Sequence, residues 1–301
     1  MTEKQMDVGI FLPMPSDGVR IDVAARTAEQ LGLDSVWYGD HLTIGHDIPI
    51  LESTTTLATA AAATERIKVG LGVYLPALRQ PVWAVKHIAS LQYLIPNDRF
   101  LLGVGLGGRV GTGPDEWEIA GVPWKGRAAR TDAFLSHLGP LLAGEEVIVN
   151  GTAVTLAPPV SKPPVWIGGD SDAALRRAAR FGEGWLGTLV PPSKVRTTIK
   201  RLEELAEECN RPRPTIGVVL HGGLTSRPNS EFVERHIRRL AGIYNLDLDF
   251  ARSVAFAGTP NEAAERLAEL REAGVGLVTQ SLPSPWQENA ELLAETRALL
   301  G

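Results

Sequence analysis

The feature that most constrains the fold is a short apolar run followed by a helical run, repeated eight times along the 301 residues. The apolar runs are mostly continuous rather than alternating, which is typical of strands that are buried on both faces. Parallel strands need long crossover connections, and eight strand–helix units with helical crossovers close naturally into a barrel. The sequence therefore predicts an α/β fold of the (β/α)₈ TIM-barrel type.

The predicted strands share this apolar composition and occupy residues 8–13, 35–41, 67–76, 99–107, 164–169, 184–189, 215–222 and 275–283. The helical runs that follow them occupy residues 20–31, 52–64, 81–95, 126–143, 171–181, 192–209, 230–244 and 286–300. Pro81, for example, suits the first turn of its helix. Each strand thus has its own helix, as a barrel requires.

Two segments interrupt this rhythm. Residues 145–159 alternate around Asn150-Gly151, which is a strong hairpin signal, and we expect this hairpin outside the barrel wall. Residues 253–274 carry an extra helix ahead of the last strand, and it opens at Thr259-Pro260. The prediction is a barrel with a hairpin insertion and extra helices at its C-terminal mouth.

Composition narrows the class of protein. Hydrophobic residues make up 44% of the chain, enough for a large core, and no linker interrupts it, so we expect a single domain over residues 1–301. The net charge is -5 with lysine and arginine spread over the helices, which argues against a nucleic-acid partner. No apolar run approaches the roughly 20 residues that cross a bilayer, so we expect no membrane partner. One cysteine and no signal-peptide pattern favour a cytoplasmic location.

Functional groups of such barrels lie at the C-terminal ends of the strands. The candidates there are Asp40, His41, Gly72, Val73, Gly105, Gly107, Gly108, Arg109, Gly168, Gly169, Asp170, Ser171 and His221. No cluster has the spacing of zinc ligands, so no metal is expected.

Seven segments resemble, in the correct order, the bacterial-luciferase-like superfamily. They are VGIFLP, SVWYGDH, RIKVGLGVYLPALRQP, DRFLLGVGLGG, GVPWKGRAARTDAFL, PPVWIGGDSDAALRRAARFGEGWL and GTPNEAAERLAEL. The resemblance covers nearly the whole chain. It implies an enzyme of small-molecule substrates, commonly a homodimer, that uses either the deazaflavin coenzyme F420 or FMN.

Asp40-His41 matches the DH pair that follows the family's second strand. In the deazaflavin branch this histidine lies beside the reactive centre of the ring, so the resemblance implies a catalytic role. Taking a hydride from an alcohol also requires removing its proton, which a histidine can accept at neutral pH. Asp40 is expected to fix the tautomer of His41. The alternative is a structural histidine that caps the loop.

The resemblance also assigns the glycines. Gly72-Val73 aligns with a bulge where a non-prolyl cis peptide presses on the cofactor ring. Gly105, Gly107 and Gly108 form part of a GxGxxG pattern, but residues 109–125 read as a loop, which disfavours a dinucleotide fingerprint. In the family this loop lies along the cofactor. The deazaflavin branch often has a glutamate near Gly108, and its absence weakens a mechanism with a paired acid.

Residues 168–171, Gly-Gly-Asp-Ser, are the predicted site for cofactor phosphate, because bare backbone N–H groups meet the start of a helix. Asp170 is expected to point away from the phosphate. Arg109 is a candidate for cofactor phosphate or an anionic substrate, or is simply solvated. His221 is a candidate substrate contact, or a satisfied loop histidine.

Three hypotheses follow. The first is an oxidoreductase that moves a hydride between coenzyme F420 and a small organic substrate. The second is an FMN-dependent monooxygenase supplied with reduced FMN by a separate reductase. The third is a flavin-binding barrel without turnover. The DH pair favours the first.

Overall fold

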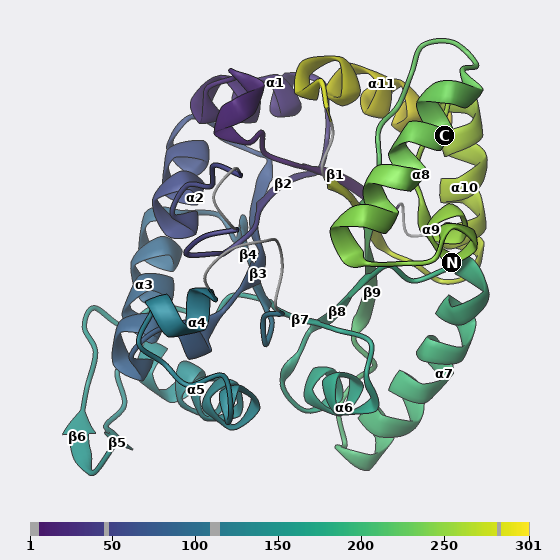
Figure 1. The fold of residues 1–301 in the computed structure, drawn as a ribbon. Helices are drawn as coiled ribbons and strands as arrows, with labels where there is room; N and C mark the ends of the chain where they lie inside the picture. Colours follow the sequence, from purple (N-terminus) through teal and green to yellow (C-terminus); the bar gives the residue numbers. More distant parts are fainter. Residues whose placement is uncertain (1–5, 45–47, 109–114, 282–283, 301) are drawn as a thin grey trace.

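The computed structural model describes residues 6–44, 48–108, 115–281 and 284–300. Eight parallel strands close into a barrel in the order β1-β10-β9-β8-β7-β4-β3-β2 (Figure 1). Their bounds are β1 Asp7–Phe11, β2 Ser35–Tyr38, β3 Lys68–Tyr74, β4 Phe100–Val104, β7 Val165–Gly168, β8 Gly184–Thr188, β9 Thr215–His221 and β10 Leu277–Ser281. The predicted (β/α)₈ barrel is confirmed.

A ring of eight helices surrounds these strands (Figure 1). They are α1 Ile21–Gln30, α2 Ser53–Ala62, α3 Pro81–Leu94, α5 Arg127–Leu142, α6 Asp172–Phe181, α7 Pro192–Glu208, α10 Pro260–Glu272 and α11 Trp286–Ala298. Local sequence fixes several starts. Proline occupies the first turn of α3, α7 and α10, and Thr259 with Glu262 forms a reciprocal capping box at α10.

The assignment of the seventh barrel helix is corrected by the structure. The sequence predicts residues 230–244 as the barrel helix and the segment after Thr259-Pro260 as the extra one. Instead α10 lies in the ring between α7 and α11, whereas α8 (Ser230–Tyr244) packs against α9 (Leu248–Val254). The reason is the depth of each apolar face, because Leu267 of α10 joins the main core and Ile237 of α8 joins only a small cluster with α9.

The predicted hairpin lies outside the barrel wall, at the lower left of Figure 1. Strands β5 (Val147–Val149) and β6 (Thr152–Val154) pair antiparallel and form a sheet of their own. Asn150 and Gly151 between them both have positive φ angles, 50° and 80°, as a tight two-residue hairpin turn requires. The hairpin therefore leaves the barrel undisturbed.

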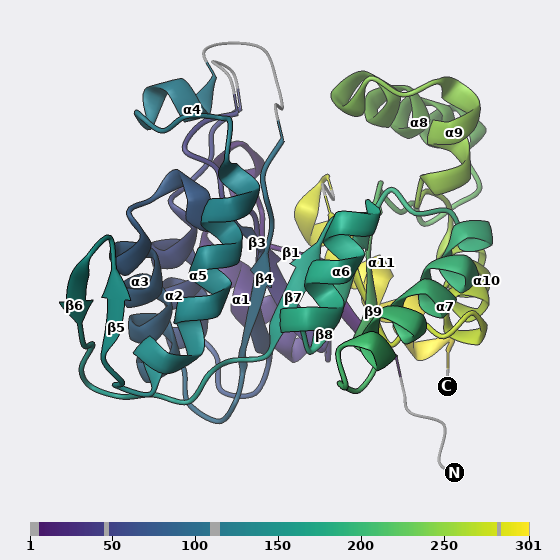
Figure 2. The same ribbon diagram turned by 90° about the horizontal axis from the view of Figure 1, so that it is seen from below.

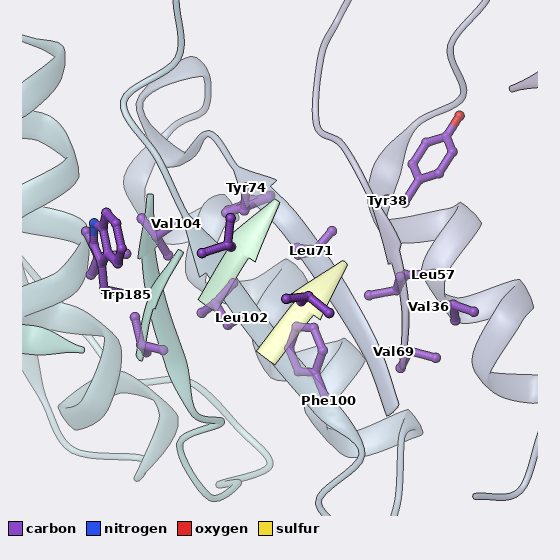
Figure 3. Close-up of a cluster of buried hydrophobic side chains, with 14 of the residues drawn as sticks. Val36, Tyr38, Leu57, Val69, Leu71, Tyr74, Phe100, Leu102, Val104 and Trp185 are labelled. Atoms are coloured by element: carbon purple, nitrogen blue, oxygen red, sulfur yellow. The ribbon is translucent and has the colours of Figure 1, made fainter. Parts of the chain in front are cut away.

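The main core lies between the strands and the helices. Figure 3 shows part of it, where side chains from β2, β3, β4, β8 and α2 meet. The labelled members are Val36, Tyr38, Leu57, Val69, Leu71, Tyr74, Phe100, Leu102, Val104 and Trp185. These residues alternate along each strand with residues that face the inside of the barrel.

A second cluster fills the inside of the barrel. It contains Trp37, Leu101, Trp166, Leu186, Val219 and Leu277, with Phe11 and Val73 packed against it. Glycines face the two indole rings: a Cβ atom on Gly70 would lie 2.4 Å from the Trp37 ring, and one on Gly184 would lie 2.2 Å from the Trp166 ring. The interior is therefore packed with side chains and is not a pore.

Candidate active site

The C-terminal ends of the strands meet at the end of the barrel that carries α4 (Glu116–Ile119), α8 and α9 (Figure 2). We call this end the mouth. Two parts of its wall differ in the residues that they present. The ends of β3, β4 and β7 present Gly72, Gly105 and Gly168, and we call this part the glycine arc. The ends of β8, β9 and β10 present Thr188, His221 and Ser281, and we call this part the polar arc.

His41 is paired with a carboxylate at the mouth. Its Nδ1 atom lies 3.1 Å from Oε1 and 3.3 Å from Oε2 of Glu116, and the backbone N–H of Leu42 donates to Glu116 Oε2 at 3.0 Å. The Glu116 side chain is 7% exposed and that of His41 is 22% exposed. A carboxylate accepts hydrogen bonds only, so it holds the proton on Nδ1. In neutral His41 the Nε2 atom is then an acceptor.

Asp40 does not orient His41, which corrects the expectation from the sequence. Its carboxylate is 2% exposed and accepts from Arg79 Nη1 at 2.7 Å and Arg79 Nη2 at 2.8 Å. It also accepts from the backbone N–H of Leu75 and from Ser53 Oγ, both at 2.8 Å. A buried charge needs such pairing, and these four bonds use both oxygens. Asp40 therefore fastens the end of β2 to the segment after β3 and to α2.

Glu116 is the residue that sequence reasoning missed. The segment 109–125 reads as a loop, and an acid is sought only near Gly108. In the structure α4 begins at Glu116, with Asp115 as its N-cap accepting from the N–H of Trp117 at 3.1 Å. Trp117 is buried and meets Trp124 edge to face at 5.4 Å, which anchors α4. The available signal was the capping Asp115 followed by a large aromatic residue.

The peptide bond between Gly72 and Val73 is cis, as the family resemblance implies. The pairing of β3 with β4 shifts register between Leu71 and Tyr74, so a bulge lies here. Val73 enters the barrel, where a Cβ atom on Gly105 would lie 2.4 Å from Val73 Cγ2 and one on Gly168 would lie 3.1 Å from Val73 Cγ1. Glycine at positions 105 and 168 thus has a packing reason that is independent of any ligand.

Gly107 and Gly108 continue the glycine arc beyond β4. Gly107 has a φ angle of +69°, and a Cβ atom on it would lie 2.9 Å from Trp117 Cζ2. Glycine lets the chain turn past the tryptophan that anchors α4. Gly108 is exposed. Arg109, the other candidate of this loop, lies outside the described residues.

The segment before α6 has the features of an anion site. Gly169 has a φ angle of +109°, and Ser171 is the N-cap of α6, accepting from the N–H of Ala174 at 3.2 Å. Residues 170–173 are exposed, so the start of α6, where the first backbone N–H groups of a helix have no partner within the helix, lies at the surface. The carboxylate of Asp170 forms an ion pair with Lys194 Nζ at 3.0 Å. Its negative charge is therefore balanced within the protein.

His221 lies at the end of β9 and is 4% exposed. Its Nε2 atom is 2.7 Å from Oγ1 of Thr188, and its ring meets Tyr244 of α8 edge to face at 5.2 Å. Burial lowers the pKa of His221 to about 4 and raises the pKa of Tyr244 to about 12. Both side chains are therefore neutral near pH 7.

Among the residues that the structure describes, no three histidine, cysteine, aspartate or glutamate side chains are placed to hold a metal ion. Within the same residues, no helix has the length and apolar character that crossing a membrane requires.

Comparison with known proteins identifies the family. The luciferase-like monooxygenase family matches residues 6–253, and the chain belongs to this family. An F420-dependent glucose-6-phosphate dehydrogenase of Beutenbergia cavernae is 29% identical over 284 residues, which are 88% of this chain and 79% of the relative. An uncharacterized protein of Mycobacterium tuberculosis is 32% identical over 186 residues, 59% of this chain and 62% of the relative. The chain thus spans less than two thirds of the latter's length.

Solved structures share the fold. An F420-dependent secondary alcohol dehydrogenase in complex with an F420–acetone adduct aligns with a TM-score of 0.83 at 17% identity, covering 99% of each chain. The oxygenating constituent of 3,6-diketocamphane monooxygenase from Pseudomonas putida, in complex with FMN, aligns with a TM-score of 0.74 at 17% identity, covering 98% of each chain. At these identities the likeness concerns the fold alone.

Proposed function

We propose that this protein is an oxidoreductase that transfers a hydride between coenzyme F420 and a small organic substrate at the barrel mouth. The observation that carries the proposal is the contact between His41 and Glu116. Because this contact holds a proton on Nδ1, the Nε2 atom of His41 can accept a proton. The 29% identity to an F420-dependent dehydrogenase over 88% of the chain supports the same cofactor class.

The residues present fit a phosphate-bearing ring cofactor. The exposed start of α6 offers backbone N–H donors and the hydroxyl of Ser171, with Lys194 beside it, and these groups suit a phosphate. Gly72 and Val73 at the bulge, with Gly105, Gly107, Gly108 and residues 168–170, would hold the rest of the cofactor. The bound deazaflavin would supply a ring that accepts or donates a hydride.

His41 would handle the proton that accompanies the hydride. Because Glu116 holds the proton on Nδ1, the Nε2 atom of His41 is the position that takes a proton from a substrate hydroxyl or returns one to a carbonyl oxygen. Protonation makes the ring a cation, and the carboxylate of Glu116 stabilises that charge. Glu116 therefore acts as a positioning residue, and Arg109 and His221 are proposed substrate contacts.

An FMN-dependent monooxygenase is the second candidate, and the fold shared with an FMN complex favours it. The same anion site at α6 would accept the FMN phosphate. In this case His41 would shape the surroundings of the flavin without transferring a proton. We further propose, from the family, a cytoplasmic homodimer.

Titration of the purified protein with F420 and with FMN, followed by absorbance, separates these candidates. We expect F420 to bind and FMN to bind at least tenfold more weakly. Turnover is then sought with secondary alcohols and with ketones, using the absorbance of F420 as the readout. Tight binding of FMN with none of F420 would replace the proposal by the monooxygenase, and binding of F420 without any turnover would favour a non-catalytic barrel.

A further inference from the structure

The order of strands places the pair of His41 and Glu116 and the pair of Thr188 and His221 on opposite sides of the mouth. In the closed barrel β2 and β8 are four strands apart in either direction, so they are diametrically opposed. His41 follows β2, and Thr188 is the last residue of β8. Thr188 therefore lies on the opposite side of the barrel wall from the strand that precedes His41.

The two arcs between these positions differ in chemistry. On one side β3, β4 and β7 present the backbone of the glycine arc. On the other side the inward positions of β9 and β10 present His221 and Ser281, because Val219 and Leu277 on the same strands belong to the inner cluster. The cofactor of the proposed function takes the glycine arc, which leaves the polar arc to the substrate.

The contacts of His221 determine which group Thr188 offers. Among the described residues, His221 Nδ1 is buried and has no hydrogen-bond partner, whereas Nε2 lies 2.7 Å from Thr188 Oγ1. A buried N–H group without an acceptor costs more free energy than a buried acceptor nitrogen without a donor. The proton of neutral His221 therefore belongs on Nε2. His221 then donates to Thr188 Oγ1, and the hydroxyl proton of Thr188 is directed elsewhere.

Thr188 is open to the mouth. The residue is exposed, although its partner His221 is almost fully buried, and it shares the inward register of Leu186, which belongs to the inner cluster. The polar arc is also uncharged, since Thr188 and Ser281 carry no charge and burial keeps His221 neutral. A neutral acceptor oxygen suits this donor better than a carboxylate or phosphate, which would need a cation.

We propose that Thr188, held by His221, donates a hydrogen bond to a neutral acceptor oxygen of the substrate. This inference rests on the proposed function. It defines the substrate class as uncharged compounds that carry a second oxygen, such as a carbonyl, apart from the carbon–oxygen group that faces His41. Thr188 is the contact residue, and His221 is the positioning residue that fixes the direction of its hydroxyl.

The tautomer of His221 is tested on the protein without any ligand. Imidazole nitrogen chemical shifts from ¹⁵N NMR distinguish a protonated from a bare nitrogen, and the signals of His221 are those that disappear in His221→Gln. We expect Nε2 to be protonated and Nδ1 to be bare at pH 7. A proton on Nδ1 would overturn the proposal, because Thr188 would then donate to His221.

Binding is tested with two probes that differ in one oxygen, cyclohexane-1,4-dione and 4-methylenecyclohexanone. Ligand-observed NMR gives their affinities for the cofactor-free and the F420-loaded protein. In the wild type and in Thr188→Ser we expect the dione to bind about five- to tenfold more tightly than 4-methylenecyclohexanone. This ratio is the contribution of one neutral hydrogen bond to the affinity. The preference should vanish in Thr188→Val, which keeps the shape and loses the hydroxyl. The proposal is overturned if the preference for the dione is the same in all three proteins, or if the dione does not bind.

A third measurement distinguishes the substrate from the cofactor as the source of the acceptor oxygen. Thr188→Val should bind F420 with the affinity of the wild type. If it binds F420 five- to tenfold more weakly and keeps its preference for the dione, the acceptor belongs to the cofactor and the assignment to the substrate is wrong. Failure of F420 to bind to the wild type would instead remove the proposed function, while the cofactor-free probe measurements would still decide the role of Thr188.

Discussion

The glycine arc and the polar arc share one barrel but are built in opposite ways. In the glycine arc the wall residues have no side chain, and a neighbouring side chain fills the space, as Val73 does beside Gly105 and Gly168. In the polar arc the side chain itself is the feature, and Thr188 and His221 hold each other. Under the proposed function the first arc would hold the ring of the cofactor, and the second would hold a ligand recognised by directed hydrogen bonds. One mouth would then separate two kinds of recognition, with the cofactor on one set of strands and the substrate on another.

The largest effect is expected at the boundary between the arcs, where His41 stands. His41→Ala should lower turnover by about 10²- to 10⁴-fold, the usual share of a positioned acid or base. F420 affinity should stay within twofold of the wild type, because the proposed cofactor contacts lie on the glycine arc and at α6. Steady-state kinetics and an F420 titration check both statements. Loss of F420 binding in this variant would place His41 in the cofactor site instead.

The polar arc should make stability depend on pH. The pKa of His221 is lowered by burial to about 4, so between pH 6.5 and 4 the unfolded chain takes up a proton that the folded protein refuses. His221 should therefore contribute a fall of about 3 kcal/mol in the free energy of unfolding as the pH drops through this window, and no pH dependence above it. Urea unfolding at several pH values checks this. His221→Gln is the control, since it lacks the titration, and identical pH profiles would contradict the burial of a neutral His221.

The glycine arc should be sensitive to a single methyl group. In Gly105→Ala the new Cβ atom would lie 2.4 Å from Val73 Cγ2, so we expect destabilisation of about 1–3 kcal/mol from overpacking. In the Val73→Ala background the mutation Gly105→Ala should cost at most half as much stability as in the wild type, because the opposing methyl groups of Val73 are gone. Thermal unfolding of the single and double variants measures it. Full additivity would mean that the two side chains do not meet.

A smaller effect is expected for Glu116→Gln, which keeps the shape of the residue and removes its charge. Turnover should fall about tenfold with unchanged F420 affinity, since a charged hydrogen bond to His41 becomes a neutral one. Combined with His41→Ala it should have no further effect, because the two residues act as a unit. A tenfold loss that persists in the His41→Ala background would assign Glu116 a role of its own.

Much of the barrel follows from the sequence, because each unit contains its own signals. The predicted strands contain the observed barrel strands, apart from Asp7 at the start of β1, since short continuous apolar runs alternate regularly with longer helical segments. The exchange of roles between α8 and α10 was not predictable in the same way. Both segments are amphipathic, and the sequence does not say which apolar face meets the barrel and which meets α9.

The site was predictable where it depends on backbone and not where it depends on partners. The cis bond at Gly72-Val73 and the capped start of α6 lie where the motifs indicate. The partner of His41 is different, because Glu116 lies 75 residues away in sequence and reaches it only through the anchoring of α4 by Trp117. Asp40, the neighbour of His41 in sequence, was the expected partner of its ring, but the carboxylate of Asp40 accepts hydrogen bonds from Arg79 instead. Adjacency in sequence does not fix which carboxylate a side chain meets.

The two tryptophans inside the barrel have a kinetic consequence. Because Trp37 and Trp166 fill the interior with their aliphatic neighbours, ligands have no passage to the opposite end. Whatever binds at the mouth must enter and leave through one opening. A molecule that covers another one at this mouth must therefore leave before the covered molecule can be released.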